Sequence, residues 1–270
     1  MEGGSRMKRG TVCVTGGAGY IGSWLIMRLL ERGYTVRATV RLDPERKRDV
    51  SHLTNLPGAS ERLQIFDADL EKRHSFDEAI KGLKEMDENS WSDVEFCRDM
   101  RIHGSSYIIP KTLIEQATLK FGEDNGLDIV SIIPPLVVGP FTCPHLPGSI
   151  SVSLAMILGT KYGLGRGFEE TLMVHIDDVV SGHIFLFECP NAKGRYICSS
   201  AETSVYELAK LISTRYPDIQ MPSEFLDETR NEKSFHLSPK KLLNLGFEFK
   251  YNLKHMVDGA IQSCKQKGFL

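Results

Sequence analysis

A glycine-rich turn near the N-terminus, between a short apolar strand and an apolar helix, most constrains how this chain can fold. The strand is predicted over Thr11–Val14, the helix over Gly19–Arg32 and a second strand over Thr35–Val40. This order is a βαβ unit, and glycines at its first turn are typical of dinucleotide-binding sheets. The alternative is a turn whose glycines only pack a helix against a strand.

Each glycine of this turn has a physical role in a nucleotide site. Gly16 permits the tight turn, Gly19 lets the backbone approach the phosphates, and Gly22 lets the helix pack closely on the strand. The free N–H groups and the positive end of the helix dipole then face the anion. We therefore predict a dinucleotide pyrophosphate at this turn, with further contacts from Thr15, Tyr20 and Ile21.

Composition and charge are those of an ordinary globular protein. Of the 270 residues, 41% are apolar, and the formal net charge is −2, so no basic field recruits nucleic acid. No apolar run is long enough to span a membrane, and the first ten residues lack the apolar segment of a secretion signal. The six cysteines lack zinc-site or disulfide-frame spacing. We expect reduced thiols, no metal and a cytoplasmic location.

The residues after the second and third strands indicate which dinucleotide is bound. Arg41 ends the second strand, where an NAD site usually has an acidic residue and where an arginine suits a 2′-phosphate. Arg48 lies in the basic stretch that follows and can reach the same phosphate, although a solvated helix face is the alternative for a charge run. Asp69 and Leu70 follow the third strand, Leu63–Phe66, where the adenine would lie. We therefore expect NADPH rather than NADH.

Two Tyr-x-x-x-Lys pairs, Tyr107/Lys111 and Tyr206/Lys210, are candidates for proton transfer. A spacing of four places both side chains on one helix face. An ammonium beside a phenol favours phenolate, so the tyrosine can donate its proton to a carbonyl near neutral pH. The first pair precedes the apolar strand Leu127–Ile133 and is the predicted catalytic pair. The second pair lies in a distal helix and is interpreted as structural.

The order of elements predicts an α/β fold with a doubly wound parallel sheet of the Rossmann type that has lost an internal segment. Such a sheet needs a fourth and a fifth strand with their crossovers, on the order of sixty to seventy residues at about thirty per unit. No apolar strand is present between Leu83 and Ser106. We predict a dinucleotide-binding region over residues 1–140, a deletion near residues 83–87 that removes these two strands, and a small substrate-binding lobe over residues 141–270.

The C-terminal lobe is predicted to alternate short strands and helices, with helices over Val152–Leu158, Val179–Glu188, Val205–Thr214 and Leu253–Gln266. His175, Asp177 and Asp178 resemble a catalytic or metal cluster. We interpret them instead as the end of a strand followed by a carboxylate that caps the helix at Val179.

Several segments together resemble the extended short-chain dehydrogenase/reductases, and within them the plant dihydroflavonol 4-reductase and vestitone reductase group. The segments are Val12–Trp24, Gly33–Arg41, Leu53–Ser60, Trp91–Asp93, Ile132–Pro140 and Gly194–Ser199. The resemblance covers nearly the whole chain. It implies NADPH-dependent reduction of a small flavonoid-type ketone, a dihydroflavonol or an isoflavanone, to an alcohol.

The resemblance also implies roles for individual residues. Tyr107 would protonate the carbonyl oxygen and Lys111 would hold the nicotinamide ribose, while Pro134, Val137 and Ser149 match positions that line the nicotinamide end. The chain departs from the family in two places. The segment that carries the family's substrate-binding serine is missing, and a proline, Pro110, lies between the catalytic tyrosine and lysine.

These departures leave other functions open. The chain could be a catalytically inactive family member that binds at most NADPH or a partner. A sugar-nucleotide epimerase or dehydratase is a further alternative, because those enzymes share the fold and the Tyr/Lys pair. The sequence predicts no oligomeric state.

Overall fold

A computed structural model of the chain describes residues 11–14, 17–40, 49–67, 87–92, 94, 98, 105–159, 170–228 and 236–270. The chain divides into two compact units, each assembled from separate stretches of sequence. The first unit comprises residues 1–70, 140–148 and 259–270, and the second comprises residues 71–139 and 149–258. The sequence predicted two regions divided at residue 140, each continuous in sequence. Each unit of the structure instead combines separate stretches of the chain.

The first unit contains a parallel three-stranded sheet in the order β1-β2-β3. Its strands are β1 (Thr11–Val14), β2 (Thr35–Val40) and β3 (Leu63–Asp67), and α1 (Tyr20–Glu31) connects the first two. Two short helices, α2 (Ser51–Thr54) and α3 (Ala59–Arg62), precede β3. The predicted βαβ unit and third strand are therefore confirmed, with ends within two residues of the expected ones.

Two remote stretches complete the core of the first unit. The ring of Phe141 packs edge-on against Tyr20 and tilted against Phe269, with ring centroids 6.2 Å apart in both pairs. The Phe141 main-chain N–H donates to Ser263 Oγ at 3.3 Å. Ser263 belongs to the last helix, α11 (Leu253–Gln266), whose predicted bounds are confirmed. The C-terminus thus packs against Phe141, which contacts the first residue of α1.

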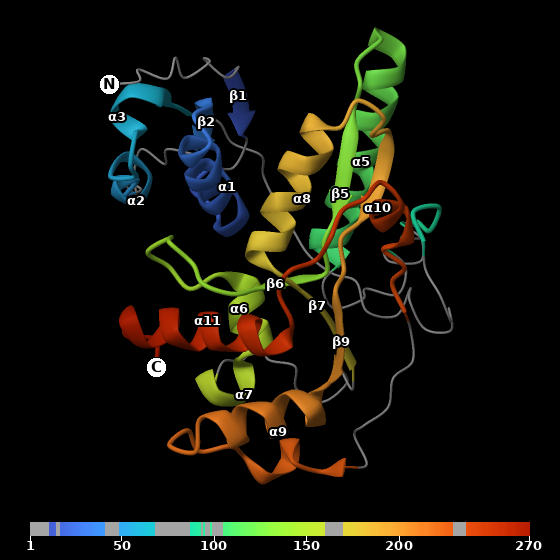
Figure 1. The fold of residues 1–270 in the computed structure, drawn as a ribbon. Coiled ribbons are helices and arrows are strands. Elements are labelled where there is room, and N and C mark those ends of the chain that lie inside the picture. The colour runs from blue at the N-terminus through green and yellow to red at the C-terminus, as the bar shows by residue number, and fades with distance from the viewer. Residues whose placement is uncertain are drawn as a thin grey trace. The chain divides into compact units, whose positions relative to one another are not determined.

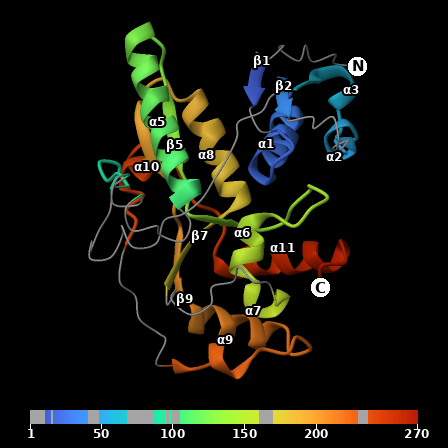
Figure 2. The ribbon, with the colours of Figure 1, turned by 180° about the vertical axis from the view of Figure 1, so that it is seen from behind.

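The second unit is built around the parallel strand pair β5 (Val130–Ile133) and β8 (Gly194–Ile197). Helices α5 (Ser105–Asn125) and α8 (Ile176–Glu188) lie on opposite sides of β5 (Figures 1 and 2). A second sheet has the order β6-β7-β9, from β6 (Leu136–Val138), β7 (Glu170–His175) and β9 (Ala201–Ser204). The remaining elements are α6 (Gly148–Ser153), α7 (Ala155–Leu158), α9 (Val205–Arg215), the 3₁₀ turn η2 (Ser223–Phe225) and α10 (Lys240–Asn244).

Among the described residues, strand β5 has a strand partner on only one edge. It pairs with β8, and among the described residues no strand pairs with its other edge or lies between β3 and β5 in sequence. All four residues of β5 are partly exposed, which is unusual for a strand of a parallel sheet. The loss of the flanking strands stays a prediction here, since residues 68–86 lie outside the described part of the chain.

Two predictions for the C-terminal lobe were wrong in detail. The helix expected over Val152–Leu158 is broken into α6 and α7, and the Ser153 hydroxyl donates to the Ser149 carbonyl at 2.8 Å, a side-chain bond that competes with regular helix. Helix α8 begins at Ile176, and its N-cap is the imidazole of His175, which accepts from Asp177 N–H at 3.1 Å. The cap is therefore not a carboxylate.

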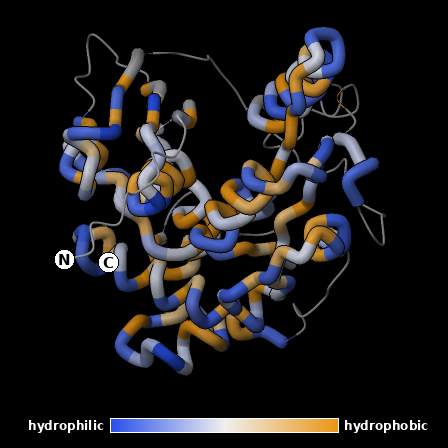
Figure 3. Tube along the Cα trace, turned by 45° about the horizontal axis from the view of Figure 1, so that its top comes forward, coloured by the Kyte–Doolittle hydropathy of each residue, from blue (hydrophilic) through white to orange (hydrophobic). Residues whose placement is uncertain are grey.

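The Asp178 carboxylate instead holds the segment before α11. It accepts from the main-chain N–H groups of Lys250 and Tyr251 at 2.9 and 3.2 Å. Apolar and polar residues alternate along the described helices (Figure 3), as expected where one face is buried. In the described part of the chain, no helix combines the length and apolar character that crossing a membrane requires.

Candidate active site

The N-terminus of α1 has the geometry expected of a phosphate-binding turn. Gly19 is its N-cap, with an extended backbone (φ −79°, ψ 170°) and no side chain to cap the helix. The first turn, which includes Ile21 and Gly22, contains no acidic residue. Because an uncapped helix N-terminus presents its N–H groups and its positive dipole end to an anion, these residues fit a dinucleotide pyrophosphate.

Tyr20 takes part in this turn through its main chain. Its ring lies in the core of the first unit against Phe141, and burial raises the pKa of its phenol well above the usual value. The Tyr20 carbonyl also accepts from the Ser23 hydroxyl at 3.1 Å. The aromatic ring therefore fixes the start of α1 and is not available as a proton donor.

Six of the predicted cofactor residues lie outside the described residues: Thr15, Gly16, Arg41, Arg48, Asp69 and Leu70. The contacts expected to the 2′-phosphate and to the adenine therefore stay predictions.

Tyr107 and Lys111 lie one turn apart near the start of α5, as the sequence predicts. The Lys111 Nζ atom is 5.6 Å from the centroid of the Tyr107 ring, which is 61% exposed. The expected lowering of the phenol pKa is not found, because desolvation raises the pKa of Tyr107 and the ammonium does not offset it. In the distal pair, Lys210 Nζ donates to the exposed Tyr206 hydroxyl at 3.5 Å.

Pro110 lies inside α5, at its sixth residue. Proline has no N–H, so the carbonyl of residue 106 lacks its helical partner there. Because Pro110 stands between Tyr107 and Lys111, it acts on the local geometry that relates the two side chains.

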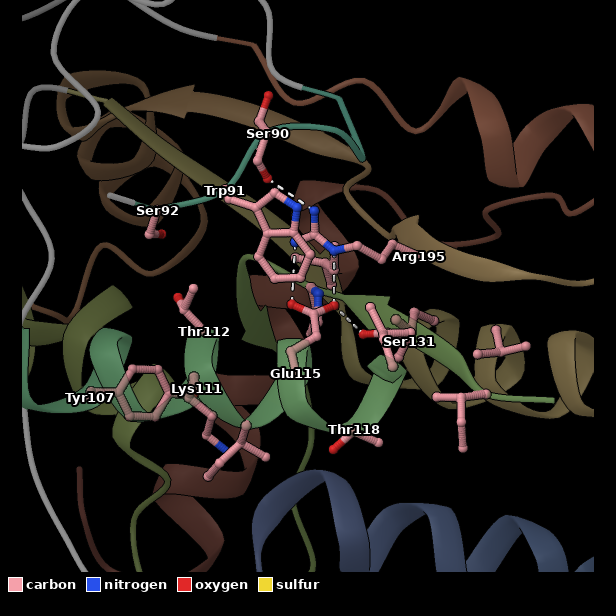
Figure 4. Close-up of a pocket in the computed structure, with 17 residues that line it drawn as sticks. Ser90, Trp91, Ser92, Tyr107, Lys111, Thr112, Glu115, Thr118, Ser131 and Arg195 are labelled. Atoms are coloured by element: carbon pink, nitrogen blue, oxygen red, sulfur yellow. Dashed lines mark hydrogen bonds and ion pairs between the residues drawn. The ribbon is translucent and has the colours of Figure 1, made fainter. Parts of the chain in front are cut away.

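A pocket of about 530 Å³ lies beside this pair (Figure 4). It is lined by α5 from Tyr107 to Leu119, by β5 and its flanking residues Ile129 and Pro134, and by residues 90–92 and Arg195. Strand β5 and its flanking residues therefore form the long wall of the pocket. The sequence-predicted residues Tyr107, Lys111 and Pro134 meet in this pocket.

The other two residues expected at the nicotinamide end lie next to each other. The Ser149 hydroxyl donates to the Val137 carbonyl at 2.7 Å, which joins the start of α6 to β6. The Val137 side chain is buried. Both residues belong to the second unit, as do Tyr107 and Lys111.

A polar cluster that also lines the pocket was not predicted from the sequence. The Arg195 guanidinium forms a two-point ion pair with Glu115, at 3.1 and 3.2 Å, and the Ser131 hydroxyl donates to the same carboxylate. The two charged side chains are only 12% and 20% exposed. Glu115 follows Lys111 by four residues, a spacing that places both on one helix face and could have drawn attention to it.

In the described part of the chain, no group of three or more His, Cys, Asp or Glu side chains could hold a metal ion. The described cysteines, Cys143, Cys189, Cys198 and Cys264, are free thiols, and three of them are buried.

Two family models match adjoining parts of the chain. The GDP-mannose 4,6 dehydratase model matches residues 13–87, and the NAD dependent epimerase/dehydratase family model matches residues 93–198. The junction between the matches lies next to the predicted deletion. These comparisons bear out the predicted nicotinamide dinucleotide cofactor at the level of the family.

Curated relatives match almost the whole chain. Noscapine synthase SDR1 of Papaver somniferum is 43% identical over 96% of this chain and 93% of its own length. The bifunctional dihydroflavonol 4-reductase/flavanone 4-reductase of Malus domestica is 38% identical, over 96% and 92%. Vestitone reductase of Medicago sativa is 40% identical, over 97% and 99%, and its crystal structure has a TM-score of 0.85, covering 97% of this chain and 100% of that one.

The comparisons also show that an internal segment is missing. The match to noscapine synthase SDR1 extends over 327 positions, whereas this chain has 270 residues, so at least 57 positions (327 minus 270) have no counterpart here. That length agrees with two missing strands and their crossovers. The chain belongs to the extended short-chain dehydrogenase/reductases, in the group of the dihydroflavonol 4-reductases and vestitone reductases.

Proposed function

We propose that this chain binds NADPH and reduces a ketone of a flavonoid-type small molecule to an alcohol. The observation that carries the proposal is the arrangement of Tyr107 and Lys111, which share one face of α5 and line one pocket. The likeness to vestitone reductase and to the dihydroflavonol 4-reductase supports the substrate class. A pocket of about 530 Å³ with mainly aliphatic strand residues on one wall is large enough for a flat polycyclic ketone.

The residues of the chain divide the work of such a reduction. When bound, NADPH supplies the hydride that is added to the carbonyl carbon. The Tyr107 hydroxyl would give its proton to the carbonyl oxygen, so that the C=O double bond becomes a C–O single bond while new C–H and O–H bonds form, and the phenolate that remains would take a proton from water. Lys111, with its ammonium beside the ring, stabilises that phenolate. Gly19, Ile21 and Gly22 hold the pyrophosphate, and Arg41 and Arg48 are the proposed partners of the 2′-phosphate.

A second candidate function is NADPH binding without turnover. It is favoured by the partly exposed residues of β5, by the exposed Tyr107 ring and by the raised pKa of its phenol. Catalysis can lose about a hundredfold for a misplacement of 1 Å. The sugar-nucleotide alternative is supported by the descriptions of the two family models alone.

The test is a turnover assay with the purified chain, NADPH and three substrates: a dihydroflavonol, an isoflavanone and a nucleoside-diphosphate sugar. We expect NADPH consumption with a flavonoid-type ketone, and a loss of about 10²-fold in the Tyr107→Phe variant. Tyr206→Phe is the matched control and should retain the activity. NADPH binding without turnover on any ketone would support the second candidate, and activity on the sugar nucleotide alone would contradict the proposal.

A further inference from the structure

We propose that Ser92 supplies the hydroxyl that binds the substrate's carbonyl oxygen beside Tyr107, in place of the serine lost with the deleted strands. This inference rests on the proposed reductase function and assigns a catalytic residue that the sequence analysis did not consider. It follows from how the segment before α5 is held, and from which hydroxyl groups the pocket contains.

The segment that carries Ser92 is anchored firmly to the second unit. Arg195 on β8 donates to the main-chain carbonyls of Glu88 and Ser90, and its guanidinium stacks on the Trp91 ring at 3.5 Å. The Glu88 carboxylate in turn accepts from the Ile197 N–H at 3.0 Å. Residues 88–91 are therefore fixed on β8.

The same guanidinium fixes this segment relative to α5. Arg195 pairs with Glu115, which lies on α5 one turn after Lys111. Ser92 follows directly after the stacked Trp91, so its place relative to Tyr107 is set by this buried ion pair. Ser92 is half-buried and lines the same pocket as Tyr107 and Lys111. In the view of Figure 4, Ser92 and Tyr107 lie toward one end of the residues that line the pocket, and the Arg195–Glu115 pair lies nearer the middle.

Other hydroxyl groups of the pocket are less suitable. The Ser131 hydroxyl is engaged with Glu115. Thr112 follows Tyr107 by five residues, about 140° around the helix, and Thr118 lies about 16 Å further along it at 1.5 Å per residue. The Ser92 hydroxyl forms no hydrogen bond with the described residues, so it is available to a ligand.

A hydroxyl in this position has a definite task. As hydride reaches the carbonyl carbon, negative charge grows on the oxygen, and a second donor besides the Tyr107 phenol stabilises that charge. Removing one such donor typically costs about 10²–10³-fold in kcat. Because Ser92 donates a hydrogen bond and no proton is transferred from it, its loss should lower kcat and leave the pH profile set by Tyr107 unchanged.

The experiment compares Ser92→Ala, Ser92→Thr and the control Ser213→Ala in the full chain, with NADPH and the flavonoid-type ketone found in the turnover assay. Ser213 is half-buried on α9 and does not line the pocket, so the activity of Ser213→Ala should equal that of the wild type. We expect kcat to fall about 10²-fold in Ser92→Ala with little change in KM, and to recover substantially in Ser92→Thr, which keeps the hydroxyl.

Each outcome has one meaning. If the wild type is active and Ser92→Ala matches Ser213→Ala, the Ser92 assignment is wrong while the reductase function stands. If Ser92→Ala is impaired but Ser92→Thr is equally impaired and both melt earlier, Ser92 is structural and the assignment is again wrong. If the folded wild type binds NADPH but reduces no ketone, the proposed function fails and the Ser92 role fails with it.

Discussion

Strands β2 and β5 are both parallel strands, but among the described residues only β2 has a strand partner on each edge. Strand β2 lies between β1 and β3, and its inward residues Val36, Ala38 and Val40 are at most 1% exposed. Within the described part of the chain β5 pairs only with β8, and all four of its residues are partly exposed. Helix α5, which packs on β5, also exposes Leu113, Ile114 and Phe121.

This difference between the two strands separates cofactor binding from catalysis, two functions that family members combine. The βαβ unit proposed to bind the dinucleotide keeps its strands and its helix. The helix that carries Tyr107 and Lys111 lies beside β5, which among the described residues has one strand partner, and the Arg195–Glu115 ion pair joins this helix to β8. Cofactor binding should therefore survive the deletion better than turnover. The predictions that follow test this contrast.

The largest expected effect comes from breaking the buried Arg195–Glu115 pair. Arg195→Ala leaves the Glu115 charge without its partner and releases residues 88–91, so we expect a loss of about 3–5 kcal/mol in unfolding free energy. Denaturant unfolding measures the loss, and hydrogen exchange locates it. Amide exchange should accelerate in α5 and β5 and stay unchanged in β1, α1 and β2.

The control for Arg195→Ala is Arg215→Ala, which breaks a similar ion pair, to Asp258, with side chains 38% and 33% exposed. That loss should be much smaller, because solvent-exposed ion pairs contribute little to stability. Equal losses in the two variants, or faster exchange in α1 after Arg195→Ala, would contradict the contrast between the two regions.

A charge at the glycine turn should abolish cofactor binding without harming the fold. Gly19 has an extended backbone that any residue can adopt, and aspartate is a favourable N-cap. Gly19→Asp should therefore preserve or raise the melting temperature. Its carboxylate repels the pyrophosphate, so we expect NADPH affinity to fall at least about 100-fold, or about 2.7 kcal/mol.

Gly19→Asn is the matched control for this variant, because it has the same size and capping ability without the charge. It should lose distinctly less affinity than Gly19→Asp. If both variants bind NADPH as tightly as the wild type, the pyrophosphate does not lie at this turn.

Sequence patterns predicted the first unit well and the second unit only in part. The bounds of β2 and α11 were predicted to the residue, because their hydrophobic periodicity is strong and the glycines mark the turn. Strand β9 was missed because Ala201–Ser204 contains no large apolar residue and is held by pairing with β7. The His175 cap was missed because an imidazole is an uncommon acceptor at an N-cap.

The residues of the candidate site were likewise predicted only in part. The spacing of Tyr107 and Lys111 predicted both the pair and its shared helix face. The cluster of Arg195, Glu115 and Trp91 joins three segments that lie far apart in sequence, and no local pattern relates them. Sequence periodicity also could not show that the phenol pKa of Tyr107 is raised, because desolvation depends on tertiary packing.

Replacing the proline in α5 should stabilise the catalytic region. Pro110→Ala restores an N–H for the carbonyl of residue 106, and we expect a gain of about 1–2 kcal/mol, less than the ~3 kcal/mol difference in a helix interior, because the position is near the start. Thermal unfolding and the helical circular dichroism signal measure the gain. If turnover is limited by the placement of Tyr107, kcat should rise as well. A less stable variant would show that the proline fits the bend of α5.

The smallest expected effect concerns the exposed ion pair between Arg215 on α9 and Asp258 on α11. Its contribution to the free energy of unfolding should depend on pH. Bonds from Arg215 and Tyr216 hold the pKa of Asp258 below its usual value of 3.8. A lowered folded-state pKa stabilises the protein above the unfolded pKa, and this contribution is lost as pH falls through the folded value. Asp258→Asn should therefore cost about 0.5–1 kcal/mol at neutral pH and nothing in strong acid.

Asp124→Asn is the control, since the Lys120–Asp124 pair is more exposed and should contribute almost nothing at any pH. Chemical denaturation at several pH values checks both variants. A cost in Asp258→Asn that persists unchanged below pH 3 would contradict the assignment.

Calorimetric titration with NADPH and NADH would show whether the dinucleotide site survives the loss of the two strands. The sample must first be shown to be folded by circular dichroism and a cooperative melting transition. We expect saturable binding of NADPH, weaker binding of NADH, and loss of both in Gly19→Asp. A folded protein that binds neither dinucleotide would contradict this expectation.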